Sequence, residues 1–168
     1  MTLVAAYPGT FDPPTIAHLA VAEAAWRACG VDRVELVLSR EPIGKEGATP
    51  LDQRVAAAEA AAATRPWLTV AVTDARLITD VAAGYDVVVM GADKWAQVLD
   101  PSYHPSEEAW QASLARLPRV AVARRGEQPI EGDVLVLDVD LGEVSSTAVR
   151  LGQVDWRWPS SDLGGAPR

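Results

Sequence analysis

Short runs of Val and Leu alternate with Ala-rich segments along most of this chain, and this alternation restricts the possible folds more than any other feature. The apolar runs show little apolar/polar alternation, which is typical of strands that are buried on both faces. They cover residues 3–7, 34–39, 68–72, 86–90, 119–123 and 134–139. The Ala-rich segments between them, residues 16–29, 51–64, 76–83 and 106–117, are long enough for helices. The alternation predicts βαβ units and a doubly wound α/β fold, a parallel sheet with helices on both faces.

The length of the chain predicts one compact domain. A chain of 168 residues buries roughly 70% of the surface that its unfolded form exposes, so its core needs no disulfide or structural metal. Cys29 is the only cysteine, which excludes an internal disulfide. We place the domain at residues 1–155 and expect residues 156–168 to form a flexible tail, because Gly, Pro and Ser are frequent there.

The charge and the apolar runs argue against two classes of partner. The formal net charge is -8, whereas proteins that bind bulk nucleic acid usually carry a basic surface. No apolar run approaches the ~20 residues of a membrane helix, and no basic stretch precedes residues 3–7 as it would in a signal peptide. A cytoplasmic protein is therefore predicted, and nothing in the sequence favours a particular oligomeric state.

The segment from Tyr7 to His18 follows the first predicted strand and is the most informative part of the chain. In doubly wound sheets, ligands bind beyond the carboxyl ends of the strands. Gly9 would let the backbone approach a ligand closely, and Thr10 supplies a hydroxyl group. The helix that starts after this segment presents free N–H groups and the positive end of its dipole. Together these features favour a phosphate ligand.

Thr15 and His18 lie three residues apart at the start of that predicted helix. On a helical first turn the two side chains share one face, so both could point to a ligand above the sheet. The alternative is that Thr15 is only the N-cap of the helix and that His18 is an ordinary, partly exposed residue.

A second hydroxyl-rich segment, residues 144–150, supports the same interpretation. Ser145, Ser146 and Thr147 offer donors to phosphate oxygens, and Arg150 lies one helical turn after Ser146 on the same face. The alternative for this segment alone is an ordinary helix cap followed by a solvated arginine.

These two segments together resemble the signature motifs of the nucleotidyltransferase superfamily. Gly9, Thr10, Phe11, Asp12 and Pro13 stand in succession and are followed by the Thr-x-x-His pattern of Thr15 and His18. Residues 144–150 are similar to the Ser-Ser-Thr motif near the C-terminus of the family, whereas Ala17 stands where the family has glycine. The resemblance implies a Rossmann-like form of the doubly wound sheet.

The resemblance also implies an activity, the transfer of an adenylyl group from ATP to a phosphate-bearing acceptor with release of pyrophosphate. Gly91, Ala92 and Asp93 resemble a segment of the branch that adenylates nicotinate or nicotinamide mononucleotide. The alternatives are a phosphopantetheine adenylyltransferase, a cytidylyltransferase-like enzyme with another acceptor, and a nucleotide-binding module without turnover. Magnesium is expected to arrive with the triphosphate, and no metal site built by the protein is expected.

The resemblance assigns roles residue by residue. His18, Thr15, Arg150 and Lys45 are the expected catalytic residues: His18 donates to the α- or β-phosphate, and Arg150 and Lys45 hold the pyrophosphate. Asp93 is expected to orient the nucleoside or the acceptor, although it could instead be a helix N-cap. The residues expected to bind the nucleotide are Gly9, Thr10, Phe11, His18, Gly91, Asp93, Ser145, Ser146 and Thr147.

Overall fold

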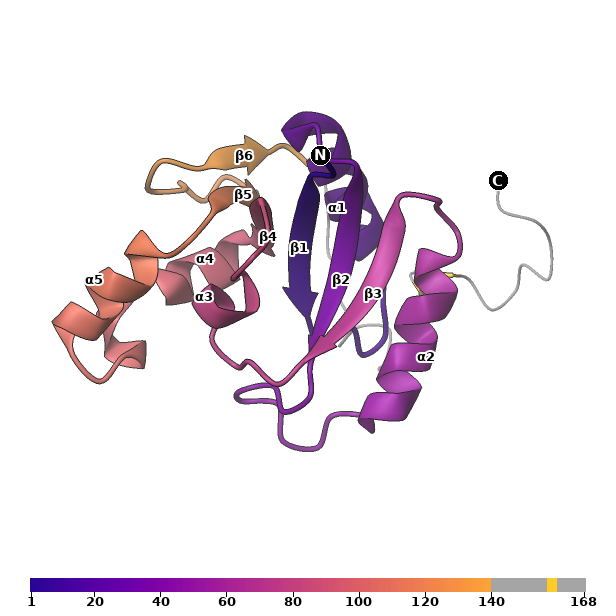
Figure 1. Ribbon diagram of the computed structural model, residues 1–168, viewed down its shortest axis with the longest axis horizontal. Helices are drawn as coiled ribbons and strands as arrows, with labels where there is room; N and C mark the ends of the chain where they lie inside the picture. Colours follow the sequence, from indigo (N-terminus) through magenta and orange to yellow (C-terminus); the bar gives the residue numbers. More distant parts are fainter. Residues whose placement is uncertain (140–156, 160–168) are drawn as a thin grey trace.

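A computed structural model of the chain describes residues 1–139 and 157–159, and it contains one six-stranded parallel sheet (Figure 1). The strand order is β3-β2-β1-β4-β5-β6. The strands are β1 (Val4–Gly9), β2 (Arg33–Ser39), β3 (Leu68–Thr73), β4 (Val87–Gly91), β5 (Arg119–Ala123) and β6 (Leu135–Leu137). All six predicted strands are confirmed, with ends that differ by a few residues.

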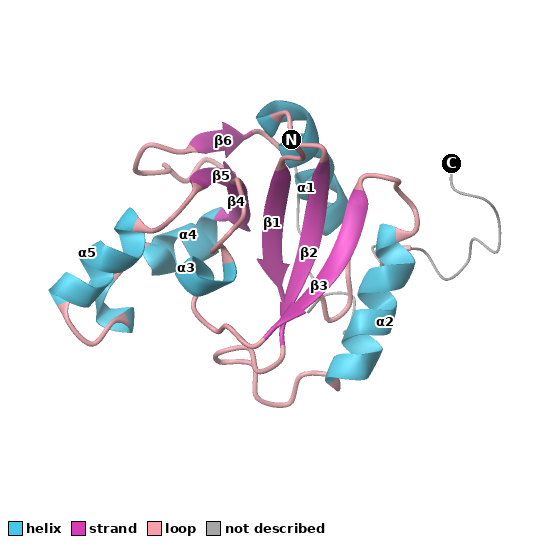
Figure 2. Ribbon diagram, in the orientation of Figure 1, coloured by secondary structure: helices cyan, strands magenta, loops and turns pink. Residues whose placement is uncertain are grey.

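Helices connect the strands, as Figure 2 shows. They are α1 (Ile16–Cys29), α2 (Leu51–Ala62), α3 (Ile78–Val81), α4 (Ala92–Val98), the 3-10 helix η1 (Pro101–Tyr103) and α5 (Glu107–Ala115). The four predicted helices are present, although α3 is a single turn. Helix α4 was not predicted because it is short and lies between Gly91 and Pro101, and it forms by burying Ala92, Trp95 and Val98. No helix in the described ranges is long and apolar enough to cross a membrane.

The helices lie on both faces of the sheet, which confirms the doubly wound α/β fold. Helices α1 and α2 pack against β1, β2 and β3 around the larger hydrophobic core, and α4 packs against β4 and β5 on the other face. The cover is uneven, since no helix lies in front of β2 and β3 in Figure 1. On that face Glu35 accepts hydrogen bonds from Tyr85, which precedes β4, and from Thr69 of β3, at 2.5 and 3.0 Å, so both carboxylate oxygens have a partner.

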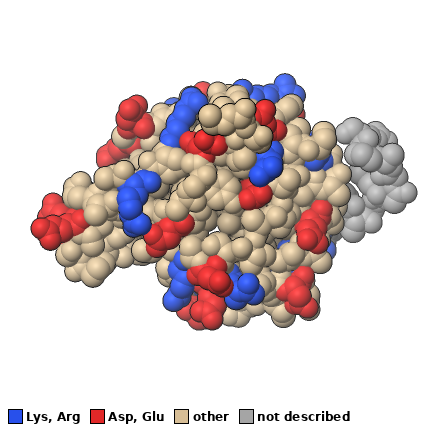
Figure 3. Space-filling model, in the orientation of Figure 1, with Lys and Arg blue, Asp and Glu red and all other residues tan. Residues whose placement is uncertain are grey.

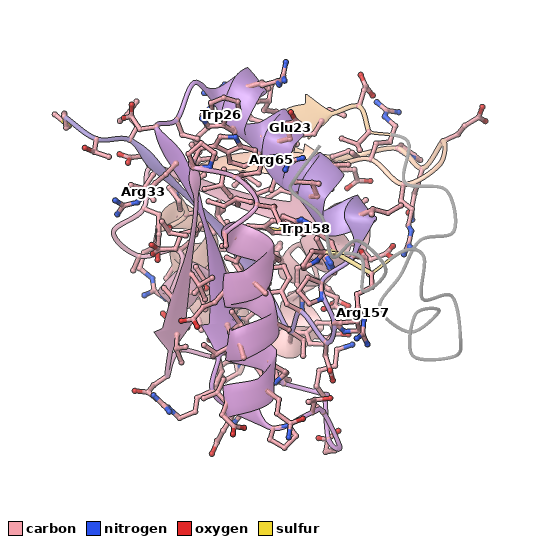
Figure 4. The ribbon with its side chains drawn as sticks, turned by 90° about the vertical axis from the view of Figure 1, so that its right-hand side faces the viewer. Glu23, Trp26, Arg33, Arg65, Arg157 and Trp158 are labelled. Carbon is pink, nitrogen blue, oxygen red and sulfur yellow. The ribbon has the colours of Figure 1, made fainter. Side chains whose placement is uncertain are left out.

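Three residues near the C-terminus pack against the start of α1. Arg157 forms an antiparallel bridge with Thr15, and the backbone N–H of Trp158 donates to the carbonyl of Pro14 at 3.0 Å. The Trp158 ring is 4% exposed, lies between α1 and α2 (Figure 4), and donates from Nε1 to Thr64 Oγ1 at 3.0 Å. Our expectation of a flexible tail from residue 156 onward is therefore wrong for residues 157–159, because a large aromatic ring gains more from burial than the short segment loses in entropy.

Candidate functional site

The segments that follow β1, β2 and β4 meet at one edge of the sheet. Strand β1 lies between β2 and β4, and all three run parallel, so their carboxyl ends share the same edge. The sequence predicts that residues 8–18, 91–93 and 145–150 converge at the carboxyl edge of the sheet, and the structure confirms this for the first two segments. Figure 3 shows side chains of both charges at this edge, at the bottom of the view. Ser145, Ser146, Thr147 and Arg150 lie outside the described residues.

The loop after β1 is closed by an aromatic ring that packs on its glycine. The Phe11 side chain is 2% exposed, and a Cβ atom built on Gly9 would lie 2.9 Å from the Phe11 ring. Phe11 has a φ of 47°, a conformation that a non-glycine residue adopts only when its surroundings hold it there. We expected Gly9 to admit a ligand and Phe11 to contact one. Instead, the space above Gly9 is filled by the Phe11 ring, which shapes the loop from inside.

Thr15 and His18 form a capping box at the start of α1. The backbone N–H of Thr15 donates to His18 Nδ1 at 2.9 Å, and Thr15 Oγ1 lies 3.1 Å from the same nitrogen. Thr15 is the N-cap residue and is 0% exposed. Our expectation that both side chains point to a ligand therefore fails for Thr15, because its hydroxyl group is turned to His18. Its part in the site is to position that ring.

The surroundings of His18 determine its protonation state. Edge-on packing against Phe11, at 5.0 Å between ring centroids, makes these surroundings apolar, and burial lowers the pKa of His18 to about 4. The ring is therefore neutral at pH 7. Because Nδ1 accepts the Thr15 N–H, the single ring proton is on Nε2. No residue in the described part of the chain bonds to Nε2, so His18 presents one fixed N–H donor.

A buried arginine, which the sequence did not identify as a site residue, holds the loop after β1 in place. Arg54 on α2 is 3% exposed, and its guanidinium donates to the carbonyl of Thr49 at 2.8 Å and to that of Thr10 at 3.4 Å. Asp12 accepts the backbone N–H of Thr49 at 3.0 Å. These bonds tie the loops after β1 and β2 together. The half-buried Thr10 thus contributes its carbonyl group to the scaffold.

The end of β4 is more open than the end of β1. Apart from its chain neighbours, a Cβ atom built on Gly91 would meet none of the described residues within 4 Å. Gly91 itself is the N-cap of α4, so the alternative in which Asp93 caps this helix is wrong. Asp93 is exposed and lies 3.5 Å from Arg125, which follows β5. This strand end therefore has open space and solvated polar groups where a ligand can approach.

Two lysines come together at the same edge. Lys45 is exposed in the loop after β2, and Lys94 lies in the first turn of α4. Partial burial and the nearby charge of Lys45 lower the pKa of Lys94. Sequence reasoning selected Lys45 and missed Lys94, although the position of Lys94 directly after Asp93 was a usable signal. Within the described ranges, no group of three or more His, Cys, Asp or Glu side chains could hold a metal ion.

Comparisons of the sequence with known proteins match one family model and two curated relatives. A family model described as cytidylyltransferase-like matches residues 6–152. A curated protein of Ruegeria pomeroyi named "Probable nicotinate-nucleotide adenylyltransferase" is 32% identical over 139 residues, which cover 75% of this chain and 62% of that protein. A protein of the same name from Symbiobacterium thermophilum is 40% identical over 68 residues, covering 39% of this chain and 33% of its own length. The chain thus matches less than two thirds of each relative.

Proposed function

Because the chain belongs to the cytidylyltransferase-like family, we propose that it transfers an adenylyl group from magnesium-bound ATP to a phosphate-bearing acceptor. The acceptor we propose is nicotinate or nicotinamide mononucleotide, since both curated relatives are named as nicotinate-nucleotide adenylyltransferases. The observation that carries the proposal is the bond from Thr15 N–H to His18 Nδ1, which leaves Nε2–H as an oriented donor at the head of α1. A cytoplasmic location remains part of this proposal.

The reaction needs positioning and charge stabilisation more than covalent help from the protein. An oxygen of the acceptor phosphate attacks the α-phosphorus in line, and a new P–O bond forms there. The bond between the α-phosphorus and the oxygen bridging to the β-phosphate breaks, and pyrophosphate leaves with that electron pair. His18 donates a hydrogen bond from Nε2 to a phosphate oxygen as the negative charge on that oxygen grows. The ring keeps this proton, because a neutral imidazole without a proton on Nδ1 would become an anion if it lost the one on Nε2.

The other residues of the site support this step in our proposal. The N–H groups at the head of α1 face the phosphates together with His18. Lys45 and Arg150 hold the leaving pyrophosphate, and Asp93 orients the nucleoside or the acceptor. Ser145, Ser146 and Thr147 donate to phosphate oxygens. Magnesium is part of the substrate, since a triphosphate brings the ion with most of its water shell.

Pyrophosphate release tests the proposal. The full chain is incubated with magnesium and either ATP or CTP, together with nicotinate mononucleotide, nicotinamide mononucleotide or phosphopantetheine. We expect release with ATP and a pyridine mononucleotide, and the dinucleotide product is identified by mass spectrometry. CTP is the second donor candidate because of the description of the matching family model. Tight binding of ATP without release in any combination would contradict the proposed activity and leave a nucleotide-binding module.

A further inference from the structure

The chain has two lysines, and the fold brings both to the same edge of the sheet. Lys45 follows β2 and Lys94 follows β4, and these two strands flank β1 on opposite sides. Both lysines therefore lie at the carboxyl edge of the sheet, on either side of the loop after β1, and the charge of Lys45 acts on Lys94. The two lysines are 49 residues apart in the chain, so only the sheet order brings them together.

Neither lysine has an anionic partner within the described residues. Two arginines at this edge do have one: Arg40 pairs with Asp74 at 2.8 Å, and Arg125 lies 3.5 Å from Asp93. Lys94 Nζ donates to the neutral amide oxygen of Gln97 at 3.2 Å. Two like charges that influence each other without a counter-ion repel, so binding of an anion to both of them is favoured even in a chain with a net charge of -8.

We propose that Lys45 and Lys94 together grip the β- and γ-phosphates of the nucleotide, the part that leaves as pyrophosphate. The proposal rests on the proposed function, and it adds Lys94 as a residue that binds the leaving group. Lysine offers a compact charge on a flexible stem, which suits an anion whose position shifts during the reaction. A polyphosphate that contacts both ammonium groups attracts each of them, and this attraction offsets their mutual repulsion. A single phosphate is smaller and neutralises mainly one of the two charges.

Partial burial, followed by the charge of Lys45, already lowers the pKa of Lys94. An anion placed between the lysines acts in the opposite direction, because it favours the charged form of both side chains. Occupation of the site must therefore raise the pKa of Lys94. Asp93 precedes Lys94 in α4 and lies 3.5 Å from Arg125, and binding of an anion to the lysines leaves this carboxylate and this guanidinium in place.

Lysine-selective ¹³C labelling tests the proposal directly, because a chain with two lysines gives two side-chain signals. The full chain is titrated with inorganic pyrophosphate and, in a second arm, with inorganic phosphate. We expect both signals to move together with pyrophosphate, the pKa of Lys94 to rise, and phosphate to bind about tenfold more weakly or worse. Nicotinate mononucleotide in a third arm reports whether an acceptor phosphate takes the same place.

Substitutions complete the test. Lys45→Met and Lys94→Met should each weaken pyrophosphate binding about tenfold, and the double variant should lose less than the sum of the two effects. Arg27→Met removes an exposed cation from the last turn of α1 and should leave binding unchanged. A pyrophosphate titration that moves only one lysine signal, or a Lys94→Met variant with unchanged affinity, would contradict joint binding by the two lysines. If pyrophosphate binds to both lysines but the chain does not release pyrophosphate from ATP, only the proposed function is contradicted.

Discussion

Two neighbouring strands of this sheet end in glycine, and the two ends differ in what lies above them. Above Gly9, at the end of β1, the Phe11 ring is so close that a Cβ atom would lie 2.9 Å from it. Above Gly91, at the end of β4, residues 1–139 and 157–159 contribute no atom within 4 Å of the same position, apart from the chain neighbours of the glycine. The first glycine is explained by the packing of the protein itself. The packing of the described residues does not explain the second, as would be expected of a glycine that allows close approach of a ligand.

The polar groups around the two strand ends follow the same division. Beside β1, Asp12, Thr15 and Arg54 form hydrogen bonds with other groups of the protein. The bond from Thr15 orients the His18 ring, so that its Nε2–H is left as a donor. Beside β4, Asp93 and Lys94 are exposed and only weakly engaged. The β1 end is thus a preorganised scaffold, while the charged groups at the β4 end remain exposed to solvent. Preorganised donors in a rigid frame favour the transition state, whereas solvated charges favour capture of an anion.

The largest expected effect comes from removing the one donor that the β1 scaffold presents. His18→Asn keeps an acceptor oxygen near the place of Nδ1, so the bond from Thr15 N–H is retained while the Nε2–H is lost. We expect kcat to fall on the order of 10²–10³, with little change in ATP affinity, because the donor acts where charge develops. Steady-state kinetics with calorimetric ATP binding measure both quantities.

His18→Ala serves as the comparison variant, since it removes the capping bond together with the donor. It should lose the same factor in turnover and, in addition, about 1 kcal/mol of stability. If a folded His18→Asn enzyme turned over at the wild-type rate, His18 would be a capping residue and the β1 end a purely structural element.

Sequence reasoning was most successful where the physics is local or periodic. The six strands, helix α1 and the position of Thr15 and His18 at the helix start follow from apolar runs and capping preferences that neighbouring residues define. It failed where a partner comes from far along the chain. The Phe11 ring over Gly9, the buried Arg54 under Thr10 and Trp158 against Pro14 depend on the packed fold, and no spacing rule in one sequence specifies them.

The comparison of the two glycines predicts a difference in stability. Gly9→Ala forces the Phe11 ring to move from a buried place, and we expect a loss of about 1–3 kcal/mol in the free energy of unfolding. Urea denaturation followed by tryptophan fluorescence measures the loss. Phe11→Leu in the same background should recover part of it, since the smaller side chain leaves room for the new methyl group. Wild-type stability of Gly9→Ala would mean that Phe11 does not hold the loop closed.

The neutral state of His18 predicts how stability depends on pH. Its folded pKa of about 4 lies below the ordinary value of 6.5, so between these pH values the unfolded chain takes up a proton that the folded chain does not. The contribution of His18 is therefore complete above pH 6.5 and is lost as the pH falls toward 4, by about 1–2 kcal/mol after allowance for its partial exposure. Urea denaturation at pH 7 and pH 5 measures this slope.

Two variants isolate that contribution. His18→Asn should flatten the slope between pH 7 and pH 5, and the same measurement on His104→Asn shows whether any loss of slope is specific to His18. Imidazole proton NMR on the wild-type chain gives the same answer independently. A His18 signal that titrates near 6.5 would show that the ring is solvated and that the capping box does not fix its tautomer.

The smallest expected change in the protein itself comes from Gly91→Ala. Gly91 has a φ of -77° and open space around its missing Cβ, so alanine fits and stability should change by about 0.5 kcal/mol or less. With a ligand bound, the added methyl group occupies space that the ligand uses, and we expect an affinity loss of roughly three- to tenfold for whichever substrate approaches β4. Calorimetric titrations with magnesium-ATP and with nicotinate mononucleotide, made separately, identify that substrate. Unchanged affinity for both would place the ligand away from Gly91, and the openness of this strand end would then have no connection with binding.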